Sequence, residues 1–275
     1  MIIAVEGGDQ AGKKTQTMML AKALRSQKIK TAVFNFPDYR TTIGKEINSY
    51  LHGKRKFSPE IIHYLYALNR REKLDEIKKS AAKNSILIMN RYYHSNLVYG
   101  MANGLDKKWL QNLDAELPRT DLVILLDISQ NESFTRKKSK RDRFEKNKEF
   151  SKKISQIYRK LAKTYRWKIV DASGTKDDVH KKILKIIFQK IGMKILSTVG
   201  GASGPLFATF FLEISKTIKD NEDELHNFCE GFNQAVNAIK QRGKSDIGQK
   251  TMLDVLIPVA EIFKTNMGDN VDRQK

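Results

Sequence analysis

The most informative chemical feature of the sequence is a glycine-rich loop close to its amino end. Gly7 and Gly12 belong to the spacing G-x-x-x-x-G-K, which ends at Lys13. The glycines allow successive backbone N–H groups to point inward, and a helix that starts after the loop adds positive potential. Lys13 is long enough to reach the β- and γ-phosphates of a nucleotide. The spacing therefore predicts a loop that binds a nucleoside triphosphate.

The residue after Lys13 departs from the usual pattern of such loops. That position normally holds Ser or Thr, whose hydroxyl binds Mg²⁺, and here it is Lys14. A charged lysine cannot bind a metal ion. Thr15 follows one place later, but a helix turns about 100° per residue and would direct it elsewhere. The protein ligands of a metal are therefore unknown at this stage.

Short apolar runs alternate with amphipathic segments over the first 190 residues. Strands are predicted at 2–5, 31–36, 86–89, 122–127 and 168–170. Helices are predicted at 15–24, 43–51, 60–79, 109–114, 132–136, 150–164 and 177–188. Apolar strands that alternate with helices are typical of a parallel sheet covered on both faces. The glycine loop follows the first strand, where such a loop can hold phosphate.

The chain changes character after Met193. Residues 194–275 hold 10 basic and 11 acidic side chains, whereas residues 1–193 hold 41 and 20. A glycine-rich stretch at 199–205 precedes amphipathic helices predicted at 206–218, 222–240 and 251–264, with no strand signal. We therefore expect two units, 1–190 and 191–275, with different partners.

Overall composition limits the class of protein. The 275 residues carry a formal charge of +20, which favours anionic partners or is simply a solvated, lysine-rich surface. Cys229 is the single cysteine, so an intramolecular disulfide is excluded and a reducing compartment is favoured. No apolar run reaches the ~18 residues of a membrane span, and the start of the chain does not read as a signal peptide. We expect a cytoplasmic protein without a membrane partner.

An ordered set of motifs over 1–190 resembles the thymidylate kinase family. The motifs are Glu6 to Gln16, Phe36-Pro37-Asp38-Tyr39, Ile43-Gly44-Lys45, Asn69-Arg70, Asn90-Arg91-Tyr92, Arg141-Asp142-Arg143-Phe144-Glu145 and Val170-Asp171-Ala172-Ser173. The resemblance implies an α/β fold of the P-loop NTPase type, with a parallel five-stranded sheet and helices on both faces, followed here by an all-α segment. It also implies a kinase of nucleotide biosynthesis that converts ATP and dTMP to ADP and dTDP and acts as a homodimer. Nucleic acid is not an expected partner, and a nonenzymatic, basic nucleotide- or nucleic-acid-binding protein is an alternative.

The resemblance assigns the acceptor nucleotide to one group of side chains. Arg70 and Arg91 would bind it, since guanidinium groups suit phosphate oxygens. Tyr66 lies one helical turn before Arg70 and would stack on the base; the alternative is a core aromatic residue. The dTMP-binding residues expected by resemblance are Phe36, Tyr39, Arg40, Tyr66, Arg70, Arg91, Ser95 and Tyr99. Tyr39 stands where the family usually has arginine, and Arg40 is its neighbour.

The resemblance also assigns the donor side and a lid. The expected ATP-binding residues are Gly7, Gly8, Asp9, Gln10, Ala11, Gly12, Lys13, Lys14, Thr15 and Arg136. Because Gln10 is uncharged, the arginine that neutralises the transferred phosphoryl group would come from the lid, with Arg136, Arg141 and Arg143 as candidates. The expected catalytic residues are Asp9, Lys13, Arg91, Arg141 and Arg143.

The metal side differs from the family at two positions. Asn90 stands where the family has an aspartate that supports Mg²⁺, and Lys14 replaces the hydroxyl. We expect ATP to bring its own Mg²⁺, with the Lys14 ammonium taking over part of the neutralising role. A degenerate, slow or inactive kinase is the competing interpretation, and an enzyme that acts on dUMP or another nucleoside monophosphate is a further alternative.

A second resemblance covers roughly 191–265. The segments 196–207, 242–244 and 250–254 resemble the nucleotide-binding helical subunit of dihydroxyacetone kinase. The metal-binding Gly-Asp-x-Asp-His-Gly motif of that family is missing, so an independent phosphotransferase is disfavoured. The segment is interpreted as a remnant of a fusion, a half completed by another chain, or an artificial junction.

Overall fold

The computed structural model describes residues 1–83, 85–136, 148–218 and 224–272. The chain divides into two compact units, Met1–Val179 and His180–Lys275. The division falls inside a long helix, ahead of the boundary that the sequence suggests near residue 190.

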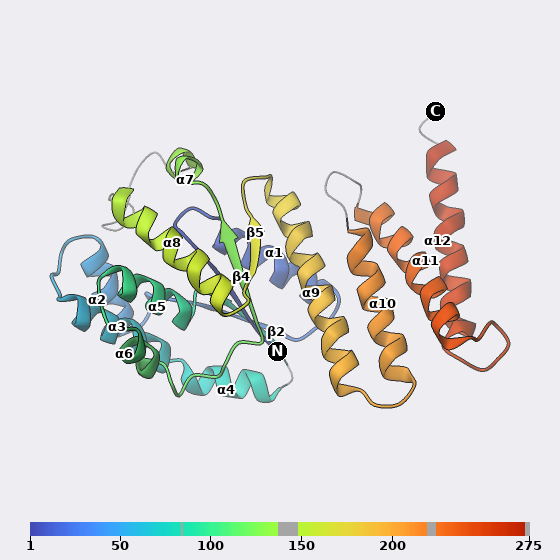
Figure 1. Ribbon diagram of the computed structural model, residues 1–275, viewed down its shortest axis with the longest axis horizontal. Helices are drawn as coiled ribbons and strands as arrows, with labels where there is room; N and C mark the ends of the chain where they lie inside the picture. The colour runs from blue at the N-terminus through green and yellow to red at the C-terminus, as the bar shows by residue number, and fades with distance from the viewer. Residues whose placement is uncertain (84, 137–147, 219–223, 273–275) are drawn as a thin grey trace. The chain divides into compact units, whose positions relative to one another are not determined.

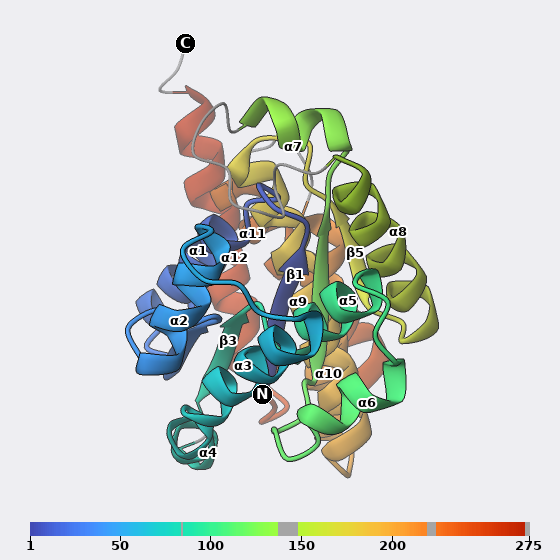
Figure 2. The ribbon, with the colours of Figure 1, turned by 90° about the vertical axis from the view of Figure 1, so that its left-hand side faces the viewer.

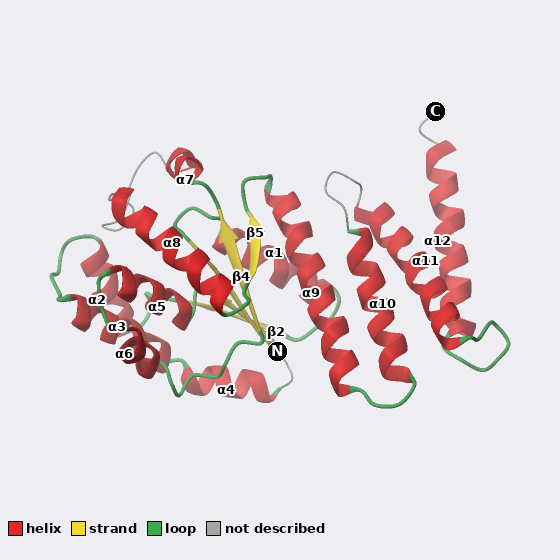
Figure 3. Ribbon diagram, in the orientation of Figure 1, coloured by secondary structure: helices red, strands yellow, loops and turns green. Residues whose placement is uncertain are grey.

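A parallel five-stranded sheet forms the centre of the first unit (Figure 3). The strands are β1 (Ile2–Gly7), β2 (Thr31–Asn35), β3 (Ile86–Asn90), β4 (Leu122–Asp127) and β5 (Lys168–Asp171). Their order is β2-β3-β1-β4-β5, so β1 lies in the middle, and all of its six residues are buried. The sequence predicts all five strands, because each is a short apolar run. Parallel pairing brings the carboxyl ends of β1 and β3 to one edge of the sheet.

Helices cover both faces of this sheet (Figure 2). In the first unit they are α1 (Lys13–Ser26), α2 (Thr42–Leu51), α3 (Pro59–Arg71), α4 (Leu74–Ala82), α5 (Tyr93–Ala102), α6 (Lys107–Leu113), α7 (Gln130–Arg136) and α8 (Lys148–Thr164). Helix α1 packs along β1 and β3, whereas α5 packs on β1 and α8 on β4. The described part of the first unit therefore has the layered α/β architecture that the alternating pattern predicts.

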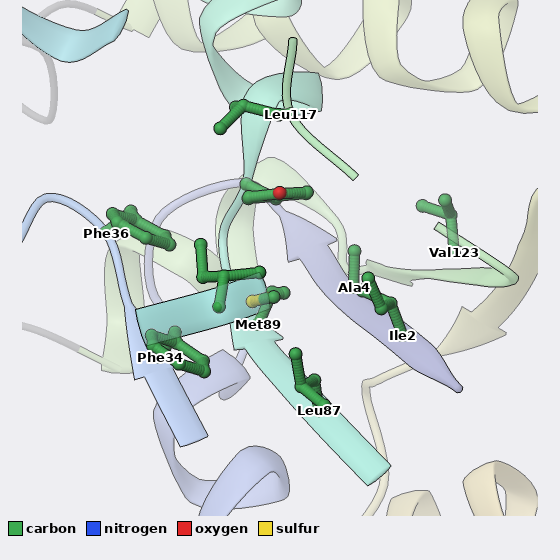
Figure 4. Close-up of a cluster of buried hydrophobic side chains, with 10 residues drawn as sticks. Ile2, Ala4, Phe34, Phe36, Leu87, Met89, Leu117 and Val123 are labelled. Atoms are coloured by element: carbon green, nitrogen blue, oxygen red, sulfur yellow. The ribbon is translucent and has the colours of Figure 1, made fainter. Parts of the chain in front are cut away.

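One apolar cluster fixes the strands that lead to the glycine loop (Figure 4). Ile2 and Ala4 of β1 lie beside Leu87 and Met89 of β3 in a cluster that also contains Phe36. Met89, Ala4 and Leu87 have no solvent exposure. Burying a Leu or Met side chain contributes about 1.5–3 kcal/mol, so Leu87 and Met89 help to hold β3 against β1.

One helix predicted from the sequence is two helices in the structure, and α5 is a helix that the apolar pattern did not predict. The prediction of one helix over residues 60–79 is wrong, because α3 ends at Arg71 and α4 begins at Leu74. The side chain of Glu72 accepts a hydrogen bond from Asn69 Nδ2 at 3.1 Å, and Lys73 pairs with Glu76 at 3.0 Å. These local polar contacts accompany the turn, and apolar periodicity carries no signal for them.

The described residues of the second unit form helices and the loops that connect them. Helix α9 (Lys176–Thr198) begins in the first unit and extends ten residues beyond the predicted end at 188. It is followed by α10 (Ser203–Thr217), α11 (Glu224–Gly243) and α12 (Leu253–Asp272), all visible in Figure 1. Phe232, Val236, Ile239, Leu253 and Ala260 form their buried core. None of the described helices is long and apolar enough to span a membrane.

Some apolar side chains of this helical unit remain exposed. Phe207 is 45% exposed, and Val255 is 67% exposed. Phe210, in contrast, packs against Phe232 with ring centroids 5.4 Å apart. Part of the apolar surface of these helices is therefore covered within the unit, and part is exposed.

Candidate active site

The glycine loop adopts the backbone conformation that its glycines make accessible. Gly7 has φ +149°, and a Cβ there would lie 2.5 Å from the carbonyl oxygen of Leu126. Gly12 has φ +85° and precedes the first residue of α1. Lys13 is 8% exposed, and its Nζ donates to the Gly8 carbonyl oxygen at 2.5 Å. The loop thus curls around its own lysine at the start of a helix, a geometry suited to phosphate.

A large cavity of about 840 Å³ opens over this loop. Its lining includes all residues from Asp9 to Gln16, together with Asn35, Phe36, Pro37, Tyr39, Asn90, Arg91, Arg136, Ala172, Gly174, Lys176 and Val179. The cavity lies at the carboxyl edge of the sheet, because β1, β2, β3 and β5 end beside these residues. We refer to it as the donor cavity.

Arg136 connects three segments that border the donor cavity. Its Nη2 donates to the carbonyl oxygen of Ala172 at 2.7 Å, and its Nη1 donates to that of Gln10 at 3.5 Å. Nearby, Ser133 Oγ donates to the carbonyl oxygen of Asp9 at 2.8 Å. Helix α7 is therefore tied to the glycine loop. The other two predicted lid arginines, Arg141 and Arg143, lie outside the described residues.

A second cavity of about 160 Å³ adjoins the first. It is lined by Asp9, Phe36, Pro37, Tyr39, Leu51, Tyr66, Arg70, Arg91, Tyr92, Ser95, Asn96 and Tyr99. We call it the acceptor cavity, because seven of the eight residues expected to bind dTMP line it. Asp9, Phe36, Pro37, Tyr39 and Arg91 line both cavities.

Arg40 is the expected acceptor residue that does not line this cavity. Its Nε and Nη2 donate to the two carboxylate oxygens of Asp38 at 2.8 and 2.7 Å, and its side chain is 85% exposed. The Arg40 guanidinium holds the pKa of Asp38 at about 2, below its usual range. Tyr39, the neighbouring candidate, lines both cavities instead.

Arg91 and Asp9 form the polar centre where the cavities meet. Arg91 Nη2 donates to Asp9 Oδ1 at 2.5 Å and Arg91 Nη1 to Ser95 Oγ at 3.1 Å. The second Asp9 oxygen accepts from the Tyr99 hydroxyl at 3.2 Å. Arg91 has φ +62°, a left-handed conformation that is uncommon outside glycine and concentrates at functional sites. The main chain is thus bent at the residue that faces both cavities.

Arg70 is held from behind by a buried carboxylate. Its Nε and Nη2 donate to Asp114 Oδ1 and Oδ2, both at 2.8 Å, and both side chains are 4% exposed. Asn96 Nδ2 donates to Asp114 Oδ2 at 3.4 Å, and His63 Nδ1 lies 2.6 Å from Asn96 Oδ1. Burial lowers the pKa of His63 to about 4, so this imidazole is neutral near pH 7. The network fixes the plane of the Arg70 guanidinium at the cavity wall.

Glu6 lies behind the acceptor cavity and holds Ser95, one of its lining residues. It has no solvent exposure and accepts from Tyr92 N at 2.8 Å, Ser95 Oγ at 2.6 Å and the Tyr158 hydroxyl at 3.1 Å. Burial alone would raise the pKa of Glu6, but His94, Ser95 and Arg91 more than offset it, so the pKa is lowered. Ser95 is therefore oriented by an ionised carboxylate.

Two aromatic residues shape the remaining wall. Tyr66 is half-buried on α3, with its ring centroid 5.7 Å from that of His63. Tyr99 is 9% exposed, and burial raises its pKa well above its ordinary value, so it stays a neutral hydroxyl donor. Asn69 holds the loop beside them, accepting from Asp38 N at 2.7 Å and donating to Thr41 Oγ1 at 2.9 Å. The wall therefore combines aromatic faces with fixed donors.

The residues near the expected metal position do not match the ligands that Mg²⁺ prefers. Lys14 and Thr15 both line the donor cavity, so Thr15 is not turned fully away from it. Asn90 Nδ2 donates to Asn35 Oδ1 at 2.9 Å across the paired ends of β3 and β2. No group of three or more His, Cys, Asp or Glu side chains able to hold a metal occurs among the described residues. Mg²⁺ is usually held by carboxylates together with substrate phosphates.

Sequence reasoning did not identify the supporting residues of the site. Asp114 is separated from Arg70 by 44 positions, and Tyr158 from Glu6 by 152. Residues so far apart in the chain do not form a local sequence pattern that could predict their contact. A buried carboxylate without an obvious partner is the one signal that could have pointed to Asp114, and burial is itself a property of the folded chain.

Comparison with known proteins agrees with this geometry. A family model described as thymidylate kinase matches residues 5–183. The thymidylate kinase of Schizosaccharomyces pombe is 35% identical over 191 residues, which cover 68% of this chain and 90% of that protein. The human thymidylate kinase is 32% identical over 66% of this chain and 87% of its own length.

Solved structures and a second family model extend the comparison. The structure of thymidylate kinase from Candida albicans has a TM-score of 0.59 and 29% identity, and the match covers 68% of this chain and 90% of that one. A model described as DAK2 domain matches residues 145–274, in line with the second resemblance. The first family model spans well over half of the chain and agrees with the layout of the two cavities, so the chain belongs to the thymidylate kinase family.

Proposed function

We propose that this chain transfers the γ-phosphoryl group of ATP to the phosphate of dTMP, giving ADP and dTDP. The observation that carries the proposal is the junction of two cavities at Asp9 and Arg91, one over the glycine loop and one lined by aromatic and guanidinium groups. A triphosphate on the loop would direct its terminal phosphate toward an acceptor in the smaller cavity. Phosphoryl transfer depends chiefly on such positioning and on charge neutralisation.

On the donor side, the loop N–H groups and Lys13 bind the β- and γ-phosphates in this proposal. Lys13 would exchange its internal bond to the Gly8 carbonyl oxygen for phosphate oxygens. Arg136 borders the cavity from α7, and Arg141 and Arg143 are proposed to neutralise the transferred group from the lid. An arginine in that role is worth about 10³–10⁵ in rate.

On the acceptor side, Arg91 binds the acceptor phosphate and Asp9 orients it. Arg91 Nη2 donates a hydrogen bond to Asp9 Oδ1 at 2.5 Å, and the acceptor phosphate would accept further hydrogen bonds from the same guanidinium. Arg70 and Tyr66 contact the nucleotide further in, with Tyr66 stacking on the base. Tyr99 lies near the sugar in this proposal, as the family resemblance implies, and its buried ring lies 5.4 Å from the Arg91 guanidinium carbon.

The second unit is proposed to be a helical appendage rather than a second catalytic centre. It matches the DAK2 model, yet the described residues contain no cluster of metal-binding side chains. Limited proteolysis tests this idea. Loss of everything after Phe188 with full kinase activity would support a passive segment, and loss of activity would contradict it.

An acceptor panel tests the proposed reaction. ADP release is followed with dTMP, dUMP, dCMP and dihydroxyacetone as acceptors, each at several concentrations. We expect dTMP to give the highest kcat/KM. A higher kcat/KM with dUMP or dCMP would reassign the base, and turnover of dihydroxyacetone alone would overturn the proposal. Sedimentation of the same preparation tests the homodimer that we propose from the family.

A further inference from the structure

The donor cavity has a strongly unbalanced charge. Among its described lining residues, five are cationic: Lys13, Lys14, Arg91, Arg136 and Lys176. Asp9 is the single acidic side chain in the same lining. A cavity with this balance attracts anions of high charge, and the N-terminus of α1 adds to the attraction.

The one carboxylate is already committed to protein partners. Asp9 Oδ1 accepts from Arg91 Nη2 at 2.5 Å, and Asp9 Oδ2 accepts from the Tyr99 hydroxyl at 3.2 Å. A divalent cation would have to compete with an arginine for this group. Binding a cation there would also leave the Arg91 charge without its counterion in a partly buried position.

The two positions nearest the phosphates replace metal ligands with a cation and an amide. Lys14, which follows the loop lysine, lines the cavity where such loops place a metal-binding hydroxyl. Asn90 at the end of β3 carries no charge and donates to Asn35 Oδ1 at 2.9 Å. Lys14 adds a positive charge where a metal ion would sit, so the two would repel each other.

We propose that this chain binds the metal-free nucleoside triphosphate at least as tightly as its Mg²⁺ complex, because the Lys14 ammonium neutralises phosphate charge that a metal ion would otherwise cancel. The proposal rests on the proposed function, since it concerns the same donor cavity. It assigns Lys14 as a binding residue and attributes nucleotide selectivity to charge rather than to metal coordination. Lysine suits the role because it acts as a compact point charge toward phosphate.

Calorimetric titration of the full chain with ATP, without acceptor, tests the proposal. One series contains EDTA and the other an excess of Mg²⁺, at equal ionic strength, because charge-dependent affinity changes with salt. The variants are Lys14→Ser and the control Lys22→Ser. Lys22 is an exposed lysine on α1 that does not line the cavity, so its loss removes the same charge from the same helix.

The wild-type chain should bind ATP in EDTA with a Kd equal to or below the value in Mg²⁺. Lys14→Ser should weaken metal-free ATP about 10-fold or more, while binding of the Mg²⁺ complex should hold or tighten. The Lys22→Ser variant should match wild type in both series. The double variant Lys14→Ser/Asn90→Asp should prefer the Mg²⁺ complex by about 10-fold.

Two other outcomes separate the proposal from the proposed function. If wild type binds the Mg²⁺ complex about 10-fold more tightly than metal-free ATP, the role of Lys14 is wrong, and the kinase assignment stands. If ATP binds in neither series although circular dichroism shows a folded chain, the donor cavity itself is misassigned. Equal effects of Lys14→Ser and Lys22→Ser would reduce the role of Lys14 to general surface charge, which also contradicts the proposal.

Discussion

Replacing Asp114 with asparagine should separate the contribution of the buried ion pair to folding from its contribution to acceptor binding. The Asp114→Asn change keeps the size of the side chain but removes the charge that faces Arg70. Both hydrogen bonds of the pair measure 2.8 Å, and both side chains are 4% exposed. Solvent cannot replace the lost carboxylate at that depth, so the Arg70 charge would stay buried without a counterion.

The size of the effect follows from the burial. Removing one partner of a buried ion pair costs about 3–5 kcal/mol of the free energy of unfolding. For a unit of this length, each kcal/mol lowers Tm by about 2–4 °C, so the expected fall in Tm is about 6–20 °C. The guanidinium at the cavity wall also loses its fixed orientation. We expect kcat/KM for dTMP to fall about 10- to 100-fold, with KM for ATP unchanged.

Differential scanning calorimetry and steady-state kinetics measure the two effects on one preparation. The neighbouring surface pair of Arg71 and Glu116 provides a matched control, since those side chains are 50% and 67% exposed. Glu116→Gln should leave Tm and both kinetic constants close to wild type. An Asp114→Asn variant with wild-type Tm would refute the energetic argument. A lowered Tm with unchanged kcat/KM for dTMP would refute the positioning of Arg70.

Three further predictions concern the rest of the site. Tyr66→Leu should raise KM for dTMP about 5- to 150-fold, since base stacking contributes about 1–3 kcal/mol, whereas Tyr66→Phe should retain most affinity in the same assay. Arg136→Ala should raise KM for ATP about 10-fold without changing KM for dTMP, because its two carbonyl contacts tie α7 to the donor cavity; equal effects on both substrates would contradict this. The pKa of His63, about 4 in the folded chain, lies below its ordinary 6.5, so the unfolded chain takes up the proton first and stability is lost as pH falls from 6.5 toward 4. His63 should therefore contribute a loss of about 2 kcal/mol in urea unfolding between pH 7 and pH 5, and His63→Gln should reduce the pH dependence by that amount; an unreduced dependence in the variant would rule His63 out as its source.

The sheet and the phosphate loop could be predicted from sequence because their signals are local. Each strand is a short apolar run, and Gly7, Gly12 and Lys13 lie within seven positions of one another. The acceptor residues required the family resemblance, since Tyr66, Arg70 and Arg91 come from separate elements. The structure places them around one cavity, and their roles there remain proposals.

The supporting contacts could not be predicted, because their partners are distant in the chain. Ser95 and Glu6 are 89 positions apart, and their hydrogen bond depends on how α5 packs on β1. The break between α3 and α4 is accompanied by polar contacts of Glu72 and Lys73, for which apolar periodicity carries no signal. Arg40 pairs with Asp38, two residues earlier, through two hydrogen bonds and does not line the acceptor cavity. The pairing with Asp38 therefore occupies the Arg40 side chain, which the family resemblance assigns to dTMP.

The most direct test of phosphoryl transfer to dTMP is a single-turnover experiment with ATP labelled at the γ-phosphorus. The enzyme is in excess over ATP, dTMP is saturating, and the labelled products are separated by chromatography. The label should appear in the β-phosphoryl group of dTDP at the rate at which ATP disappears, and Lys13→Met should abolish this transfer while the chain stays folded. Label that remains in ATP, or that appears only as inorganic phosphate, would contradict the assignment of this chain as a dTMP kinase.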